Sequence, residues 1–130
     1  MDPIANMLTQ LRNATLIGQR TVTVSHSRIK QQIAKLLESH DFLKAVTSTK
    51  TETGHSELVL ELLYTNDAPA IRSIRRLSTP GLRRYRKASD LPKPRGGFGI
   101  VVVSTPQGLM TTDQARRAHT GGEIICEVLS

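Results

Sequence analysis

The chain has 130 residues, 38% of them hydrophobic and only 3% aromatic, so it can hold one ordinary domain or two small ones with an aliphatic core. Eighteen Lys and Arg oppose eleven Asp and Glu, and this formal net charge of +7 favours a polyanionic partner, although a membrane surface or an acidic protein would balance it equally well. Cys126 is the single cysteine and no secretory signal or long apolar run is seen, so we expect a reducing, cytoplasmic location without a disulfide or a membrane span.

The first residues predict an amphipathic helix over residues 3–13. Asp2 can cap the free amides of the first turn, and Pro3 is tolerated at the first helical position. Apolar residues then recur at helical spacing, at Ile4, Met7, Leu8 and Leu11. This pattern places Arg12 and Asn13 near the exposed end of the helix.

A short strand and a second helix are predicted next. Residues 21–24 alternate between Thr and Val, as in a half-buried strand. Either Ser25 or Ser27 can cap the helix that follows, which is expected to end near Ser39. Its apolar stripe consists of Ile29, Ile33, Leu36 and Leu37.

The middle of the chain predicts two strands and then a boundary. Residues 42–49 and 58–64 are the strand candidates, with a polar turn between them. Residues 66–69 are turn formers, and the net charge changes there from +1 over residues 1–66 to +6 over residues 67–130. The sequence therefore predicts an α+β architecture in two small halves that meet at this boundary.

The second half begins with short elements. Residues 71–77 fit an irregular strand or one helical turn, residues 79–81 must turn, and residues 82–87 could form a returning strand. Residues 89–92 are expected to cap a short helical turn. The glycines of residues 96–99 predict a loop with unusual backbone angles.

A strand, a short helix and a closing strand are expected at the end of the chain. The first strand covers residues 100–104, and the helix ends near Ala118, before Gly121 and Gly122. Candidate caps for the helix are Thr111, Thr112 and Asp113. In the closing strand, residues 123–129, one face should carry Ile124, Cys126 and Val128, and the other Ile125 and Leu129.

The strongest chemical signal is a basic cluster over residues 72–95. It holds nine cations opposed only by Asp90, a net charge of +8, which favours a bound polyanion over a merely solvated basic face. Tyr85 lies among these cations and could stack on an unpaired base or could equally cover the core. The cations are Arg72, Arg75, Arg76, Arg83, Arg84, Arg86, Lys87, Lys93 and Arg95.

Other motifs carry weaker signals. The turn over residues 104–108 presents hydroxyls and amides that could donate to phosphate or ribose oxygens, or it could be an ordinary connection. The glycines of residues 96–99 precede a strand, unlike nucleotide-binding motifs, which follow one. Cys126 lies in an apolar strand and is expected to pack as a small hydrophobe, and the sequence has no metal-type cluster, so neither an enzyme nor a cofactor is indicated.

The ordered segments resemble the bacterial small-subunit ribosomal protein eight family over nearly the whole chain. The matching segments are Asp2-Pro3-Ile4-Ala5-Asn6-Met7-Leu8-Thr9, Leu11-Arg12-Asn13-Ala14, Pro80-Gly81-Leu82-Arg83 with Tyr85, Leu91-Pro92-Lys93, Gly99-Ile100, Val103-Ser104-Thr105, Gly108-Leu109-Met110-Thr111, Ala115-Arg116 and Gly121-Gly122-Glu123-Ile124-Ile125-Cys126. Each segment is weak alone, but together they occur in the family's order with compatible spacing.

The resemblance implies an N-terminal α-β-α-β-β unit and a C-terminal α+β unit. It implies a structural, non-enzymatic protein that binds the central domain of small-subunit ribosomal RNA beside neighbouring ribosomal proteins, and in some bacteria also its own messenger RNA. The implied principal RNA contacts are Ser104 and Thr105 in the turn, Tyr85, and the corner at Gly121, Gly122 and Glu123. From their own chemistry, Arg83, Arg84 and Arg86 of the basic cluster and Gln107 of the turn are expected to bind RNA as well. Arg12 and Asn13 resemble a second contact region, and Glu123 is expected to accept a hydrogen bond from a base or ribose, or to brace the loop.

The sequence departs from the family pattern at four positions. Pro106 and Gln107 stand where many members have Ser and Lys, so one hydroxyl, one backbone donor and one cation are missing, while Pro106 can stiffen the turn and Gln107 can still hydrogen-bond. Glu127 stands where an aromatic residue is common, and Thr112 where an acid commonly caps the helix. An RNA-binding repressor outside the ribosome, an organelle ribosome and, more distantly, an RNA-directed enzyme are alternatives that the sequence leaves open.

Overall fold

The computed structural model describes residues 2–130, which form helices and antiparallel sheets, so the α+β prediction is confirmed. The chain divides into two compact units, Pro3–Arg72 and Asp2 together with Ser73–Ser130. Each unit has its own sheet. The separate folding of two domains that meet at residues 66 and 67 stays a prediction.

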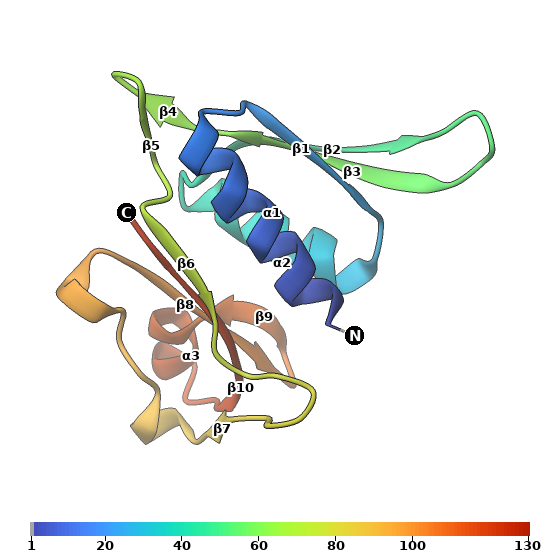
Figure 1. Ribbon diagram of the computed structural model, residues 1–130. Coiled ribbons are helices and arrows are strands. Elements are labelled where there is room, and N and C mark those ends of the chain that lie inside the picture. The colour runs from blue at the N-terminus through green and yellow to red at the C-terminus, as the bar shows by residue number, and fades with distance from the viewer. Residues whose placement is uncertain (1) are drawn as a thin grey trace. The chain divides into compact units, whose positions relative to one another are not determined.

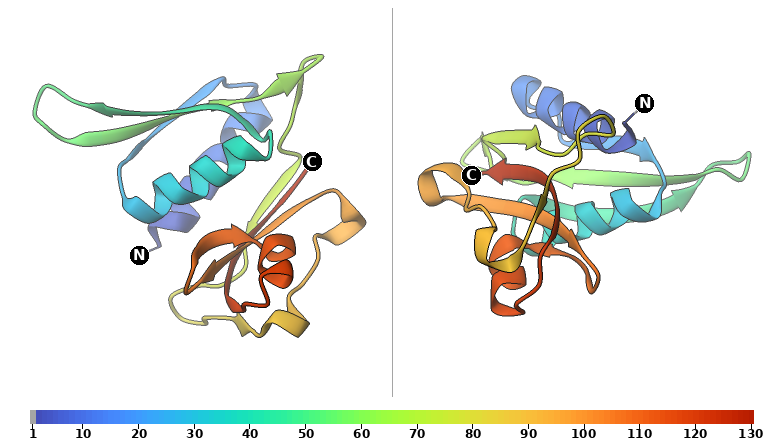
Figure 2. Two further views of the ribbon diagram at one scale, coloured as in Figure 1. Left: turned by 180° about the vertical axis from the view of Figure 1, so that it is seen from behind. Right: turned by 90° about the horizontal axis from the view of Figure 1, so that it is seen from below.

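The first unit follows the predicted order of helix, strand, helix and two strands (Figure 1). The elements are α1 (Pro3–Ile17), β1 (Thr21–Ser25), α2 (Arg28–Ser39), β2 (Leu43–Lys50) and β3 (Ser56–Leu62), and a short ribbon of β4 (Tyr64–Thr65) and β5 (Ala68–Pro69) follows. The sheet has the antiparallel order β1-β3-β2. Figure 2 shows the β2–β3 hairpin extending beyond both helices.

The core of this unit is aliphatic, as the composition predicts. Both helices bury one stripe of residues, and β1 and β3 bury alternate side chains. Ser27 is the N-cap of α2, and its hydroxyl accepts a hydrogen bond from the Lys30 amide at 3.2 Å. The helix α1 runs to Ile17, past the predicted end at residue 13, because Ala14 continues the buried stripe and no helix breaker comes before Gly18.

The second unit is built on an antiparallel sheet with the order β6-β10-β8-β9, in which β7 also pairs with β10. Its strands are β6 (Ser73–Arg76), β7 (Tyr85–Arg86), β8 (Gly99–Thr105), β9 (Gly108–Thr111) and β10 (Gly122–Leu129). Its helices are the short turns η1 (Ala88–Asp90) and η2 (Arg95–Gly97), and α3 (Thr112–Arg117). One core cluster of this unit contains Leu91, Val101, Val103, Ala115 and Ile124.

The unusual backbone angles predicted for residues 96–99 are confirmed, but the segment is not a plain loop, because Gly96 and Gly97 lie in η2 and Gly99 begins β8. Gly96, Gly97 and Gly99 have φ angles of 74°, 79° and 144°. A Cβ atom at Gly99 would also meet the backbone of β10, 2.8 Å from the Cα atom of Leu129. Glycine is therefore required there by both conformation and space.

Several local predictions for this unit are wrong. Within residues 82–87 only Tyr85–Arg86 form a strand, because Thr79 and Leu82 close a tight turn of their own. Ser89 lies inside η1, whose N-cap position is Lys87 without a side-chain cap. The strand β9 was not predicted at all.

The cap of α3 is Thr111, one of the three candidates. Its hydroxyl accepts from the Gln114 amide at 3.1 Å, while the Gln114 side chain accepts from the Thr111 amide at 2.9 Å, which completes a capping box. The neighbouring Thr112 does not cap the helix, because its hydroxyl donates to the carbonyl oxygen of Pro92 at 2.8 Å.

The predicted alternation along the closing strand is interrupted. Ile124 pairs with Val103 and Cys126 with Val102, so a bulge leaves Ile125 as an extra residue in β10. Since Val102 and Val103 point to opposite faces of β8, Ile124 and Cys126 do as well. The expectation that these two residues share a face is therefore wrong.

Candidate nucleic-acid interface

Three of the segments predicted to contact RNA lie on neighbouring strands of the second unit. In the sheet register Tyr85 of β7 is opposite Glu123 of β10, and Glu123 is opposite Ser104 of β8. Directly opposed residues of an antiparallel pair project to the same face, and the strands are about 4.8 Å apart. Tyr85, Glu123 and Ser104 thus form a row roughly 10 Å long, which we call the polar row.

The two glycines beside the polar row are required by close packing of backbones. A Cβ atom on Gly121 would overlap the carbonyl oxygen of Arg86, and one on Gly122 would overlap the carbonyl oxygen of Ser104. Both overlaps involve backbone atoms, which cannot move aside as a flexible side chain can. Gly121 and Gly122 therefore allow β10 to approach β7 and β8 closely.

The carboxylate of Glu123 braces the chain within the unit. Its Oε2 atom accepts a hydrogen bond from the Ser78 hydroxyl at 2.6 Å, and its Oε1 atom lies 3.4 Å from the exposed guanidinium of Arg83. The Ser78 hydroxyl in turn accepts from the Arg84 amide at 3.0 Å. The bracing role that the resemblance offered for Glu123 is therefore present in the structure.

The two hydroxyls of the predicted turn differ in their availability. Thr105 is buried, and its hydroxyl donates to the Gly108 carbonyl at 2.8 Å and accepts from the Gln107 amide at 3.1 Å. Ser104 is partly exposed, and no hydrogen bond within residues 2–130 involves its hydroxyl. Thr105 thus shapes the β8–β9 turn, in which Pro106 and Gln107 are exposed, and Ser104 keeps a donor for an external group.

Tyr85 and its neighbours are presented to solvent. The side chain of Tyr85 is 62% exposed, so the alternative that its ring covers the core is wrong. Arg83, Arg84, Arg86 and Lys87 are exposed too, and the Arg86 guanidinium donates to the Tyr85 carbonyl at 2.9 Å. An exposed aromatic ring among guanidinium groups can stack on a base while the cations bind phosphates.

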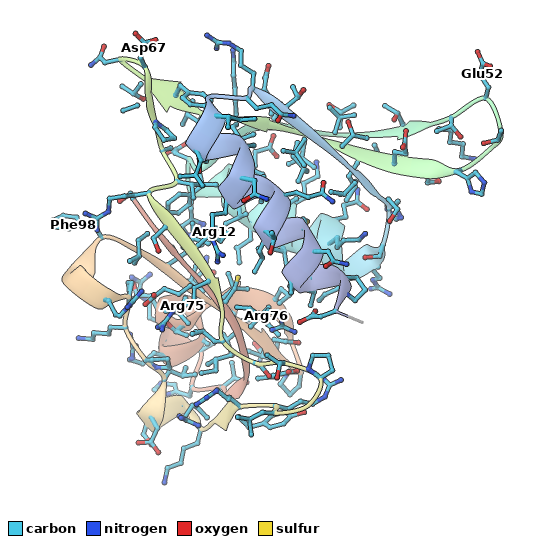
Figure 3. The ribbon with its side chains drawn as sticks, in the orientation of Figure 1. Arg12, Glu52, Asp67, Arg75, Arg76 and Phe98 are labelled. Atoms are coloured by element: carbon cyan, nitrogen blue, oxygen red, sulfur yellow. The ribbon has the colours of Figure 1, made fainter. Side chains whose placement is uncertain are left out.

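Four arginines of the basic cluster are neutralised by carboxylates that lie outside it in the sequence. Figure 3 labels Arg75 and Arg76, consecutive residues of β6. Arg75 lies 3.4 Å from the buried carboxylate of Glu127, and Arg76 donates to Asp2 at 3.1 Å. Arg83 pairs with Glu123 as described, and Arg95 binds Glu127 at 3.0 Å.

This pairing corrects the charge argument made from the sequence. The cluster was expected to be opposed by Asp90 alone, but Asp2, Glu123 and Glu127 also neutralise it. Four cations of the second unit have no carboxylate partner within residues 2–130, and we call them the open cations: Arg84, Arg86, Lys87 and Lys93. Three of them, Arg84, Arg86 and Lys87, flank Tyr85, so most of the unpaired positive charge of this unit lies beside the polar row.

The remaining predicted contact residues belong to the other unit. Arg12 and Asn13 are exposed residues of α1, in its interior and not near its end, and Figure 3 labels Arg12 there. The structure places the C-terminal candidates in strands of one sheet or in the segments that adjoin them, and it places these two residues in the other unit.

The surroundings of Cys126 do not favour a nucleophilic thiol. Cys126 is fully buried, and its burial raises the pKa of the thiol to about 12, although the positive charge of Arg76 opposes this shift. A thiol with this pKa stays protonated at neutral pH and is a poor nucleophile. Among the described residues no three His, Cys, Asp or Glu side chains come together as a metal site would require, and no helix is long and apolar enough to cross a membrane.

Sequence reasoning missed Ser78 and the pairing role of Glu127. Both side chains are buried although they are polar, with exposed fractions of 0% and 3%. Their partners are 45 and 32 residues away in the chain, at Glu123 and Arg95. No local pattern marks such pairs, although an acid inside an apolar strand, as Glu127 is, indicates that a cation must lie nearby.

Comparison with known proteins gives a consistent result. A family model described as ribosomal protein S8 matches residues 2–129. The chain is 40% identical to the small ribosomal subunit protein uS8 of Cereibacter sphaeroides (strain KD131 / KCTC 12085) over 127 residues, which cover 98% of both chains. It is 42% identical over 127 residues to the protein of that name from Xanthomonas campestris pv. campestris (strain B100), covering 98% of this chain and 96% of the relative.

Proposed function

The chain belongs to the ribosomal protein S8 family, and we propose that it is a structural protein of the small ribosomal subunit that binds the central domain of small-subunit ribosomal RNA directly. The observation that carries this proposal is the polar row. Three segments separated by up to 38 residues, around Tyr85, Ser104 and Glu123, are brought side by side by strand pairing. The open cations beside the row provide the charge that a polyanion requires.

In this proposal affinity and specificity come from different contacts. The open cations bind phosphates and supply affinity that depends on salt but not on base sequence. The Ser104 hydroxyl, the Tyr85 ring and the exposed side chain of Gln107 recognise the shape and particular groups of the RNA. Glu123 is largely occupied by its bracing contacts, so its free lone pairs add at most one further acceptor.

The other unit is assigned an auxiliary contact. Arg12 and Asn13 are exposed on α1 and are proposed to touch a second RNA segment, as the family resemblance suggests. Neighbouring small-subunit proteins are further proposed partners. A messenger RNA that presents the same groups as the ribosomal helix would compete for the polar row, which is how translational autoregulation would operate.

Footprinting on full-length small-subunit ribosomal RNA tests the main proposal. We expect the purified protein to protect a helix of the central domain from chemical probes, and the protein to co-sediment with small subunits in a sucrose gradient. Protection elsewhere in the RNA, or none at all, would contradict the assignment. Binding to a messenger without co-sedimentation would instead favour a repressor that acts outside the ribosome.

A further inference from the structure

A buried serine lies behind the segment that carries Arg83 to Arg86. Ser78 is completely buried, whereas residues 79–87 are all exposed. Its hydroxyl donates to the Glu123 carboxylate at 2.6 Å and accepts from the Arg84 amide at 3.0 Å. One hydroxyl therefore joins the middle of the polar row to the backbone next to Tyr85.

The segment around Ser78 is attached to β10 at both of its ends. The Leu77 amide donates to the Ile125 carbonyl at 2.9 Å, and the Ile124 amide donates to the Arg84 carbonyl at 2.9 Å. Between these points the turn from Thr79 to Leu82 hydrogen-bonds mainly to itself. Ser78 adds a side-chain link inside this frame through a hydroxyl that is itself fully buried.

The link to Ser78 holds Glu123 more firmly than the salt bridge does. The Arg83 guanidinium approaches the two carboxylate oxygens at 3.4 and 3.5 Å and is 57% exposed, so this pair is long and screened by solvent. The Ser78 contact is shorter by about 0.8 Å, comes from a fully buried hydroxyl, and involves a charged acceptor, which makes it a strong hydrogen bond. The position of the Glu123 carboxylate therefore depends chiefly on Ser78.

We propose that Ser78 is a positioning residue for RNA recognition. It contacts no RNA itself but fixes the Glu123 carboxylate and the Arg84 backbone. In this way it holds Tyr85 in place relative to Glu123 and Ser104, the other two members of the polar row. This inference rests on the proposed function, because it assigns a role within the same surface. Without the hydroxyl, Arg84 loses an acceptor for its amide and Glu123 loses its short hydrogen bond, so the row loses its fixed geometry.

The test replaces Ser78 by Ala in the full chain and measures binding to two RNAs at one salt concentration. The probes are a central-domain fragment of small-subunit ribosomal RNA and an unrelated duplex of equal length. We expect Ser78→Ala to weaken binding to the cognate fragment roughly tenfold or more, because a short hydrogen bond to a charged group is lost. Binding to the unrelated duplex should change less than about twofold, since no charge is altered.

Ser89→Ala is the matched control, because it removes an exposed hydroxyl from the same basic segment. It should leave both affinities unchanged. Circular dichroism establishes that each variant is folded at the temperature of the binding assay. Equal losses on both RNAs, or no loss on the cognate fragment, would overturn the positioning role.

A double-mutant cycle with Glu123→Ala separates positioning from general stability. If Ser78 acts through Glu123, the Ser78→Ala change should cost much less in the Glu123→Ala background, and Glu123→Gln, which keeps an acceptor, should retain most of the affinity. Additive losses would refute the inference. Failure of the unmodified protein to bind the cognate fragment would instead count against the proposed function, so the two outcomes are distinguishable.

Discussion

Replacing Gly122 by Ala tests whether close backbone packing creates the polar row. A Cβ atom at this position would overlap the Ser104 carbonyl oxygen and lie 2.8 Å from the Ser104 carbonyl carbon and 3.1 Å from the Thr105 Cα atom. Because these are backbone atoms, β10 or β8 must shift to make room. Overpacking of this kind costs about 1–3 kcal/mol. For a chain of this length that cost corresponds to a fall in Tm of roughly 3–15 °C.

Thermal unfolding followed by circular dichroism measures the stability, and filter binding measures the cognate RNA affinity below the transition. We expect Gly122→Ala to lower both, with an affinity loss of at least about fivefold, comparable to one lost hydrogen bond. Gly81→Ala is the matched control, because no atom lies within 4 Å of a Cβ there. Wild-type stability and affinity in Gly122→Ala would refute the packing argument.

Three further predictions address charge and hydrogen bonding. The open cations can neutralise at most about four phosphates, so log affinity should fall against log salt concentration with a slope of roughly −2 to −4, and a flat dependence in filter binding would contradict this. Glu127→Gln leaves Arg75 without its buried partner and should lower the free energy of unfolding by about 1–2 kcal/mol in urea titrations, a value reduced because the arginines are about half exposed. Ser104→Ala should weaken cognate RNA binding about fivefold at unchanged Tm, whereas Thr105→Val should lower Tm because it removes the turn's internal hydrogen bonds. The opposite pattern would mean that Thr105 binds RNA and Ser104 shapes the turn.

The elements with strong local signals were predicted from the sequence. The Ser27 cap, one of two candidates, and the alternation of β1 each depend on residues within a few positions of one another. The same holds for the stripe of α2, of which Ile33 and Leu37 are buried while Ile29 and Leu36 are half-buried. The unusual backbone angles of residues 96–99 were predicted for the same reason, since three glycines at close spacing indicate positive φ angles. Local patterns therefore sufficed for most of the first unit and for the framework of the second.

Two of the features that the sequence did not predict depend on how strands pair. The bulge at Ile125 follows from the register between β10 and β8, and no residue type marks it. The short β9 strand pairs with β8 across the two-residue turn at Pro106 and Gln107, so its partner is local, and it was missed because its composition is ordinary. Such features are decided by pairing between segments, which a reading of neighbouring residues does not show.

The charge available for RNA binding also depends on segments that are distant in the sequence. Counted along the sequence, residues 72–95 carry +8, which suggests that most of their arginines await an anion. In the structure Arg75, Arg76, Arg83 and Arg95 are held by carboxylates from other segments. A buried carboxylate such as Glu127 is tolerated only because arginines pair with it, so part of the cluster exists to satisfy the fold. Three of the four open cations adjoin Tyr85, and most of the electrostatic contribution to binding is therefore expected where the hydroxyl and aromatic groups of the polar row provide specificity.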